Sequence, residues 1–327
     1  MSMGGLDPAI SLAENYRVWG LEAQGRSPAY VTLSNAVAGD STILEFLGTL
    51  PPDKRQPNLL FASAYYLLGS PADPGALRDL VRHDPDRLSQ VMQTRRTQTN
   101  EAARCATLLP ALAQLPEPLA LIEVGASAGL TLLFDRYSYD YGDLVITGSD
   151  PEAPTLRCGL RGPVPVPDRV PEIAWRAGLD LNPLDVSSDD DVHWLSCLLW
   201  PGEGDRAERL ALAVASARRS PPVIHRGDLL TDLPTLVAQA PAGATVVVYH
   251  SAVLAYVAPE DRERFASTVR GLGVAWFSNE APGVVPGVPL DGRDDGTFVL
   301  ARDGSKALAR TDGHGDWVEW LPVPDGS

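Results

Sequence analysis

The chain has 327 residues, of which 44% are hydrophobic and 21% charged, close to the average of globular proteins that bury a sizeable core. Its formal net charge of -15 would repel phosphate backbones and anionic lipid surfaces, so neither nucleic acid nor a membrane is expected as a partner. The 3 cysteines lie far apart in the sequence, which argues against a disulfide framework or a C-x-x-C metal site. Without a signal-peptide pattern or a long apolar run, we expect a cytoplasmic protein. The histidines show no metal-ligand spacing such as H-E-x-x-H, so we expect no metal.

Before residue 117, apolar residues recur at helical spacing and no strand pattern is visible. The expected helices cover residues 10–21, 29–37, 43–50, 59–68 and 76–81, followed by a longer helix over about 86–115 that is interrupted at Pro110. Two prolines, Pro116 and Pro118, end this region. The sequence therefore predicts a helical N-terminal cap region over residues 1–117.

From residue 118 onward, strand and helix patterns alternate. The expected strands cover 119–124, 173–179, 223–226, 245–250 and 274–278, and the expected helices cover 129–137, 192–200, 206–219, 233–240 and 259–271. Such alternation is typical of a parallel sheet with helices on both faces. Two last runs, 297–302 and 307–320, predict an antiparallel hairpin. We interpret residues 138–170 as an insertion and residues 281–296 as a mobile loop, because both are rich in proline and glycine.

The run 119–130, with the sequence LALIEVGASAGL, predicts a buried strand that leads through a glycine-rich turn into a helix. Glycines let a ligand approach the backbone, and the start of a helix offers N–H donors. Glu123 lies two positions before Gly125, and Gly129 follows four positions later. This spacing of an acidic residue and glycines is typical of the loop that binds S-adenosylmethionine in methyltransferases, although Ser127 replaces the middle glycine. The same residues also match the G-x-S-x-G turn of serine hydrolases.

Further acidic residues at strand ends favour the cofactor interpretation, because an adenosine needs acceptors for its ribose hydroxyls and its amino group. In doubly wound sheets these acceptors come from the carboxyl ends of successive strands. Asp180 is the predicted ribose ligand, and Asp228 with Leu229 is the predicted adenine contact. Asp150 competes for the ribose role, since it follows Gly129 at the spacing of about 20 residues that is expected of a dinucleotide fold.

The hydrolase alternative would use Ser127, Asp228 and His250, which occur in the chain order Ser, Asp, His of such enzymes. It fits less well, because the first strand of the sheet would then carry the nucleophile and two more strands would follow the histidine. In a methyltransferase, His250 lies at the end of a strand that commonly lines the transferred methyl group. Its ordinary pKa, about 6.5, suits a general base.

Substrate contacts are predicted around the same edge of the sheet. Gln98, Glu101 and either Arg104 or Cys105 are spaced to share one helix face near the first strand, and Asn100 lies beside them. The predicted substrate-binding residues are Asn100, Glu101, Arg104, Tyr137, Tyr249 and Glu280.

Five runs of the chain, at residues 58–62, 97–101, 123–130, 178–186 and 249–256, resemble an uncharacterised bacterial family, domain of unknown function 2332. That family is grouped by similarity with Rossmann-like methyltransferases. The resemblance implies an α/β fold with a Rossmann-like class I methyltransferase-type sheet of seven strands over residues 118–327. This sheet is expected to be mostly parallel, to end in a C-terminal antiparallel hairpin and to follow the helical N-terminal region.

The expected function is methyl transfer from S-adenosylmethionine to an unidentified small molecule. A serine hydrolase is one alternative. A non-catalytic module that binds a nucleotide or S-adenosylmethionine is another, because the serine at the middle glycine position narrows the loop.

Overall fold

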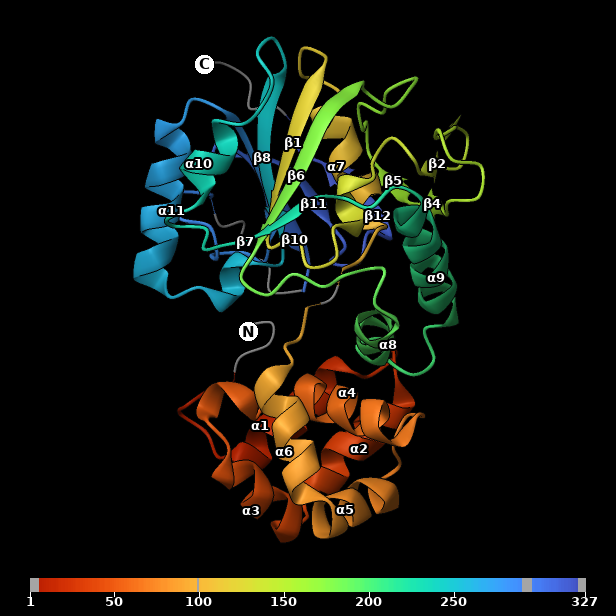
Figure 1. Ribbon diagram of the computed structural model, residues 1–327, viewed down its shortest axis with the longest axis vertical. Helices are drawn as coiled ribbons and strands as arrows, with labels where there is room; N and C mark the ends of the chain where they lie inside the picture. Colours follow the sequence, from red (N-terminus) through yellow and green to blue (C-terminus); the bar gives the residue numbers. More distant parts are fainter. Residues whose placement is uncertain (1–5, 99, 290–295, 323–327) are drawn as a thin grey trace. The chain divides into compact units, whose positions relative to one another are not determined.

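The computed structural model describes residues 6–98, 100–289 and 296–322. The chain divides into two compact units (Figure 1). One contains the large sheet and comprises Asn100–Ser187 and Arg209–Ser327, and the other is helical and comprises Ser2–Thr99 and Ser188–Glu208. The division differs from a single boundary near residue 117, because helix α7 (Arg104–Leu112) belongs to the sheet unit and helix α8 (Asp189–Cys197) to the helical unit.

The helices predicted before residue 85 are confirmed. They are α1 (Leu12–Glu22), α2 (Pro28–Ala38), α3 (Ser41–Thr49), α4 (Pro57–Leu68) and α5 (Pro74–His83), with a short 3-10 turn η1 (Pro52–Lys54) and helix α6 (Pro85–Thr94) completing the series. Side-chain oxygens of Ser11, Asp40 and Asp73 accept backbone N–H groups at the starts of α1, α3 and α5. These caps satisfy donors that a helix cannot pair internally, so the helix starts are encoded locally.

The five strands predicted for the parallel part of the sheet are also confirmed. They are β1 (Leu119–Val124), β6 (Ile173–Asp180), β7 (Ile224–Arg226), β8 (Thr245–Ser251) and β9 (Ala275–Glu280). In space they follow the order β7-β6-β1-β8-β9, with every neighbouring pair parallel. The protein therefore has an α/β fold with a large, mostly parallel sheet.

The end of the chain adds antiparallel strands to β9. Strands β10 (Phe298–Arg302), β11 (Lys306–Thr311) and β12 (Trp317–Trp320) form a meander, so the predicted final strand is in fact two. They are separated by a turn in which the Asp312 carboxylate accepts the His314 N–H. The predicted insertion supplies β5 (Gly159–Arg161), which pairs with β12 in the large sheet. It also supplies a separate sheet of β2 (Ser138–Asp140), β3 (Val145–Ile146) and β4 (Thr155–Arg157).

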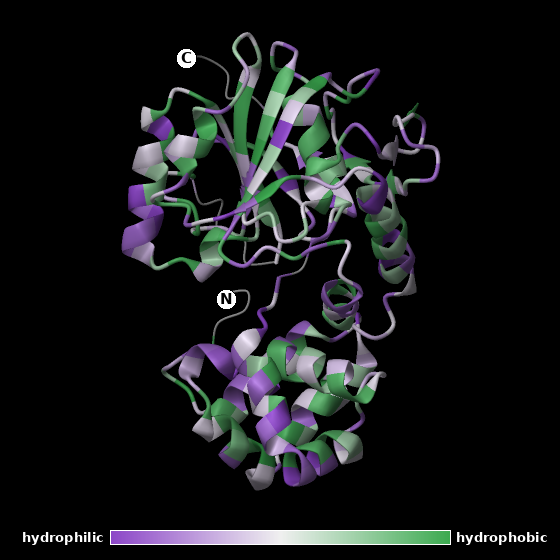
Figure 2. Cartoon of the chain, in the orientation of Figure 1, coloured by the Kyte–Doolittle hydropathy of each residue, from purple (hydrophilic) through white to green (hydrophobic). Residues whose placement is uncertain are grey.

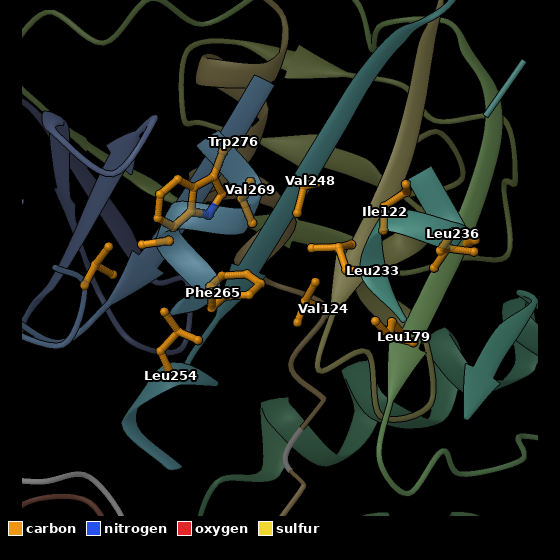
Figure 3. Packing of buried hydrophobic residues seen from close by; sticks show 13 residues of the cluster. Ile122, Val124, Leu179, Leu233, Leu236, Val248, Leu254, Phe265, Val269 and Trp276 are labelled. Carbon is orange, nitrogen blue, oxygen red and sulfur yellow. The ribbon is translucent and has the colours of Figure 1, made fainter. Parts of the chain in front are cut away.

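Helices α10 (Leu233–Val237) and α11 (Pro259–Gly271) lie on one side of the sheet and α7 on the other (Figure 1). On the α11 side, Ile122 and Val124 of β1 pack with Phe265 and Trp276 in a buried hydrophobic cluster (Figure 3). Successive side chains of a strand alternate between faces, so Glu123 points to the α7 side. The central strands are mostly hydrophobic, whereas the helices carry both hydrophobic and hydrophilic residues (Figure 2).

Two helix predictions are wrong. Residues 129–137 form only a 3-10 turn, η2 (Leu130–Leu132), because the Leu130 carbonyl accepts the Tyr137 hydroxyl and the Thr131 carbonyl accepts the Tyr249 hydroxyl. The described residues of 95–103 lie between α6 and α7 outside any helix. There the carbonyls of Arg95 and Arg96 accept side-chain donors from Lys54 and Trp194. The shared helix face predicted for Gln98, Glu101 and Arg104 therefore does not exist.

Other expectations concern loops and membranes. Within the predicted mobile loop, Val285 is buried and the Pro286 carbonyl accepts a bond from Arg270, so this part is held against the sheet unit, while residues 290–295 lie outside the described residues. Helix α9 (Gly204–Arg219) confirms the helix predicted over residues 206–219. No helix in the described part of the chain combines the length and apolar character needed to cross a membrane.

Candidate functional site

The strand order reverses between β1 and β8. From β1 the chain builds outward through β6 and β7, and it then returns to the other side of β1 to add β8 and β9. In sheets wound in this way, loops leave the two central strands in opposite directions, and ligands bind in the crevice that opens at the carboxyl ends. The loops after β1, β6 and β8 therefore define the candidate site.

The glycine loop after β1 has a left-handed backbone at several positions. The φ angles of Gly125 and Gly129 are both 71°, and that of Ser127 is 52°. A Cβ on Gly125 would lie 2.4 Å from Cγ2 of Val253, and one on Gly129 would lie 2.7 Å from Cγ of Pro222. The gaps left by the two glycines are therefore filled by the chain itself. Backbone conformation and internal packing explain both glycines, and their contact with a cofactor stays a prediction.

Asp180, at the end of β6, lies against this loop. Its Oδ2 accepts the Ser127 N–H at 2.8 Å, and its Oδ1 accepts the Asn182 N–H at 2.7 Å. The Ser127 carbonyl accepts the Leu184 N–H in turn. The structure thus brings together the loop after β1 and the acidic end of the neighbouring strand, as the sequence predicted.

Asp150, the competing ribose candidate, has a different environment. Its Oδ2 accepts hydrogen bonds from the Ser216 hydroxyl, from Arg219 and from Arg136, at 2.7, 2.7 and 2.8 Å. These bonds, led by that from Ser216, hold the pKa of the carboxyl well below its usual range despite burial. Asp150 therefore joins α9 to the segment after η2, and its role as a ribose ligand stays a prediction.

Asp228 and Leu229 follow β7, the next strand along the edge. The Asp228 Oδ1 accepts the Leu230 N–H at 2.7 Å, and the Asp228 N–H donates to Asp232 at 2.7 Å. Leu229 is partly buried and packs against the hydrophobic cluster of the α11 side. In this structure both residues stabilise their own turn, and their adenine contacts stay a prediction.

Glu123 is buried on the α7 side of the sheet. Its Oε1 accepts the Thr131 hydroxyl, and its Oε2 is buried without a hydrogen-bond partner among the described residues. Burial raises the pKa of Glu123 to about 8, although the bond from Thr131 and the charge of Arg104 act in the opposite direction. The carboxyl is therefore mostly protonated at neutral pH. Its hydrogen bond with Thr131 holds the far end of the glycine loop against β1.

Three predicted substrate residues also hold this far end. Asn100 accepts the Leu130 N–H at 2.7 Å, the Tyr137 hydroxyl donates to the Leu130 carbonyl at 2.7 Å, and the Tyr249 hydroxyl donates to the Thr131 carbonyl at 3.1 Å. All three side chains are buried. The structure brings them together at the glycine loop, where they fix its backbone.

Glu101 and Arg104 lie in the same short segment. The Glu101 carboxylate accepts Nε of Arg209 at 2.7 Å. Arg104 is 6% exposed, and its guanidinium donates to the carbonyls of Gly313 and Ser251 at 2.9 and 3.1 Å. Arg104 thus joins the start of α7 to the ends of β8 and β11.

His250 is fully buried on the α11 side. Its Nδ1 lies 2.7 Å from Oε1 of Glu280, and its Nε2 accepts the indole N–H of Trp276 at 3.1 Å. Because Nε2 accepts, the proton of the neutral ring is on Nδ1 and is donated to Glu280. Both ring nitrogens are engaged within the core, so the structure does not assemble Ser127 and His250 into a hydrolase pair.

Sequence reasoning named His250 and Glu280 but missed their pairing. Polar residues at matching ends of two predicted neighbouring strands, β8 and β9, were a signal that could have found it. It also missed Val253, because nothing local shows that this valine packs on Gly125. Among residues 6–98, 100–289 and 296–322, no group of three or more His, Cys, Asp or Glu side chains is arranged to hold a metal ion.

A family model with the description "Uncharacterized protein conserved in bacteria (DUF2332)" matches residues 13–320. The chain belongs to this family. The match runs from α1 to the last strand, so it includes both compact units and every residue of the candidate site. No curated protein and no solved structure matches the chain.

Proposed function

We propose that the protein binds S-adenosylmethionine at the carboxyl ends of β1 and β6 and transfers its methyl group to a small molecule. The observation that carries the proposal is the position of Asp180. This carboxylate lies at the end of the strand beside β1, within hydrogen-bond distance of the glycine loop, in a sheet whose order reverses at β1. In doubly wound nucleotide-binding folds, an acidic side chain at the equivalent place accepts the ribose hydroxyls.

The chain's own residues fit the adenosine part of such a ligand. Asp180 is only partly buried, and Asp228 follows β7, the parallel neighbour of β6. The two carboxylates thus follow neighbouring strands on one edge of the sheet, and we assign Asp180 to the ribose hydroxyls and Asp228 to the adenine amino group. At Gly125 the fit requires a rearrangement, because Val253 covers the backbone that a ligand would approach.

Methyl transfer from a sulfonium is an in-line displacement, for which the bound cofactor supplies the reactive carbon. The protein would contribute positioning and the exclusion of water. Asn100, Glu123 and Tyr249 hold the loop rigidly for this purpose. His250 would have to release Glu280 or Trp276 before it could act as a base, so we assign it a positioning role in which it supports the end of β8.

Calorimetric titration with S-adenosylmethionine and S-adenosylhomocysteine tests the proposal. We expect both to bind, and Asp180→Ala to weaken binding at least tenfold, since hydrogen bonds to a charged group contribute about 1.5–3 kcal/mol. Asp205→Ala, in the first turn of α9, is the matched control and should bind as the wild type does. Absence of binding by well-folded wild-type protein would refute the proposal.

Binding without turnover is the second candidate, and the engaged ring nitrogens of His250 favour it. The two are separated by incubating the protein with S-adenosylmethionine and a broad library of metabolites and measuring formation of S-adenosylhomocysteine. Product formation that Asp180→Ala abolishes establishes the transferase. Tight binding of S-adenosylmethionine without formation of S-adenosylhomocysteine in any reaction favours a non-catalytic binding module.

A further inference from the structure

A short segment directly after β8, residues 252 and 253, lies on the start of the glycine loop. Its Val253 packs so closely on Gly125 that a Cβ on the glycine would lie 2.4 and 2.8 Å from the two methyl carbons of the valine. Val253 is only partly buried, whereas the next residue, Leu254, is fully buried in the hydrophobic cluster, so the part of the chain that can leave the loop ends at Val253. Val253 therefore fills the space that the absent side chain of Gly125 leaves open, which is one side from which a ligand would approach this backbone.

Glu280 holds this segment in place. Its Oε1 accepts the N–H groups of Val253 and Leu254 at 2.8 and 3.1 Å, in addition to the bond from His250. Its Oε2 is buried and has no hydrogen-bond partner among the described residues. A buried carboxylate oxygen without a donor is unfavourable, so the closed segment leaves a polar group that another arrangement could pair.

The backbone of the segment is strained at Ala252, whose φ of 57° lies in the left-handed region that a side chain with a Cβ disfavours. The Ala252 N–H donates to the Asn279 carbonyl at 3.1 Å, which helps to keep this conformation. Ser127, in the loop that the segment covers, has the same kind of backbone. Elsewhere in the described part of the chain, only Asp303 in the β10–β11 turn is a non-glycine residue with positive φ. Such strain clusters at ligand sites and switch regions.

We propose that residues 252 and 253 form a latch. When it is closed, Glu280 holds Val253 on Gly125; when it opens, the segment leaves Glu280, Ala252 relaxes, and the glycine loop becomes accessible to a ligand. The identity of that ligand as S-adenosylmethionine rests on the proposed function, whereas the opening is a property of the chain alone. Since only the open state binds, the apparent affinity is reduced by the fraction of molecules that are open.

Amide hydrogen exchange of the unliganded protein tests the opening. Ala252→Gly removes the strain of the closed state, so exchange at residues 252–254 should slow about threefold. Glu280→Gln weakens the acceptor of two N–H groups, so exchange there should quicken about tenfold or more. Val145→Ala, at a residue of β3 that is 61% exposed, is the control and should change nothing. Protection of residues 245–249 should stay unchanged in all variants, which separates opening from unfolding.

Titration with S-adenosylhomocysteine tests the consequence for binding. Val253→Ala should tighten binding about threefold, and Ala252→Gly should weaken it by the factor found for exchange. If the wild type binds and neither variant changes the affinity or the exchange, the latch is refuted and the proposed function stands. If exchange responds as expected but neither the wild type nor any variant binds S-adenosylhomocysteine, the latch stands and the proposed function fails. If Ala252→Gly and Glu280→Gln change the rate of amide exchange in the same direction, the latch is also refuted.

Discussion

The buried carboxyl of Glu123 should make the stability of the sheet unit depend on pH in a direction opposite to that of most acidic residues. Burial raises its pKa from the ordinary 4.5 to about 8. Between these values the folded protein keeps a proton that the unfolded chain has released. The contribution of Glu123 to the free energy of unfolding is therefore fully present below pH 4.5 and is lost as the pH rises through 8.

The size of this loss follows from the two pKa values. One pH unit is worth about 1.4 kcal/mol for a single titrating group, so the full interval corresponds to about 5 kcal/mol as an upper limit. Glu123→Gln replaces the protonated acid with a neutral side chain of the same shape that does not titrate. Relative to the wild type, this variant should gain about 1.4 kcal/mol for each pH unit between 4.5 and 8.

Urea unfolding at intervals from pH 5 to 8.5, followed by circular dichroism, measures the difference between the two proteins. Taking the difference removes the effect of every other titrating group that the substitution leaves unchanged. Glu152→Gln, at a side chain that is 75% exposed, is the control and should differ little from the wild type at any pH. A difference between Glu123→Gln and the wild type that stays constant with pH would refute the assignment of a neutral Glu123.

Three more substitutions test the packing of the site. Gly125→Ala should destabilise the protein by about 3 kcal/mol, measured by urea unfolding. Adding Val253→Ala should recover the steric part of this loss but leave about 1 kcal/mol of backbone cost. No recovery in the double variant would contradict the contact between Gly125 and Val253. Asp150→Asn should lower the free energy of unfolding by about 3 kcal/mol at pH 7. Because the pKa of the Asp150 carboxyl is lowered, this difference from the wild type should shrink only as the pH falls below about 4. A difference that stays unchanged down to about pH 2 would contradict the ion pairs. Trp276→Phe leaves the buried Nε2 of His250 without its donor, so thermal unfolding should report a loss of about 1–3 kcal/mol, and an unchanged melting temperature would contradict the hydrogen bond.

Elements with a local cause were predictable from the sequence. Strand β1 and helix α11 have the predicted bounds, because a run that is apolar except for Glu123 and a proline start define them within a few residues. The position of Asp180 beside the glycine loop was also predictable, since residues that end neighbouring parallel strands meet at one edge of the sheet.

The sequence by itself thus determined the α/β class, the five parallel strands and the acidic residues at their carboxyl ends, because periodicity and strand ends are properties of short segments. Only the tertiary structure decided that residues 129–137 do not continue as a helix, since Tyr249, more than 100 positions away, takes the Thr131 carbonyl. It also decided that Val253 fills the gap at Gly125 and that Glu280 holds both His250 and the segment over the loop. These contacts join residues that are distant in the chain, and no local pattern specifies which distant side chain satisfies a given backbone group.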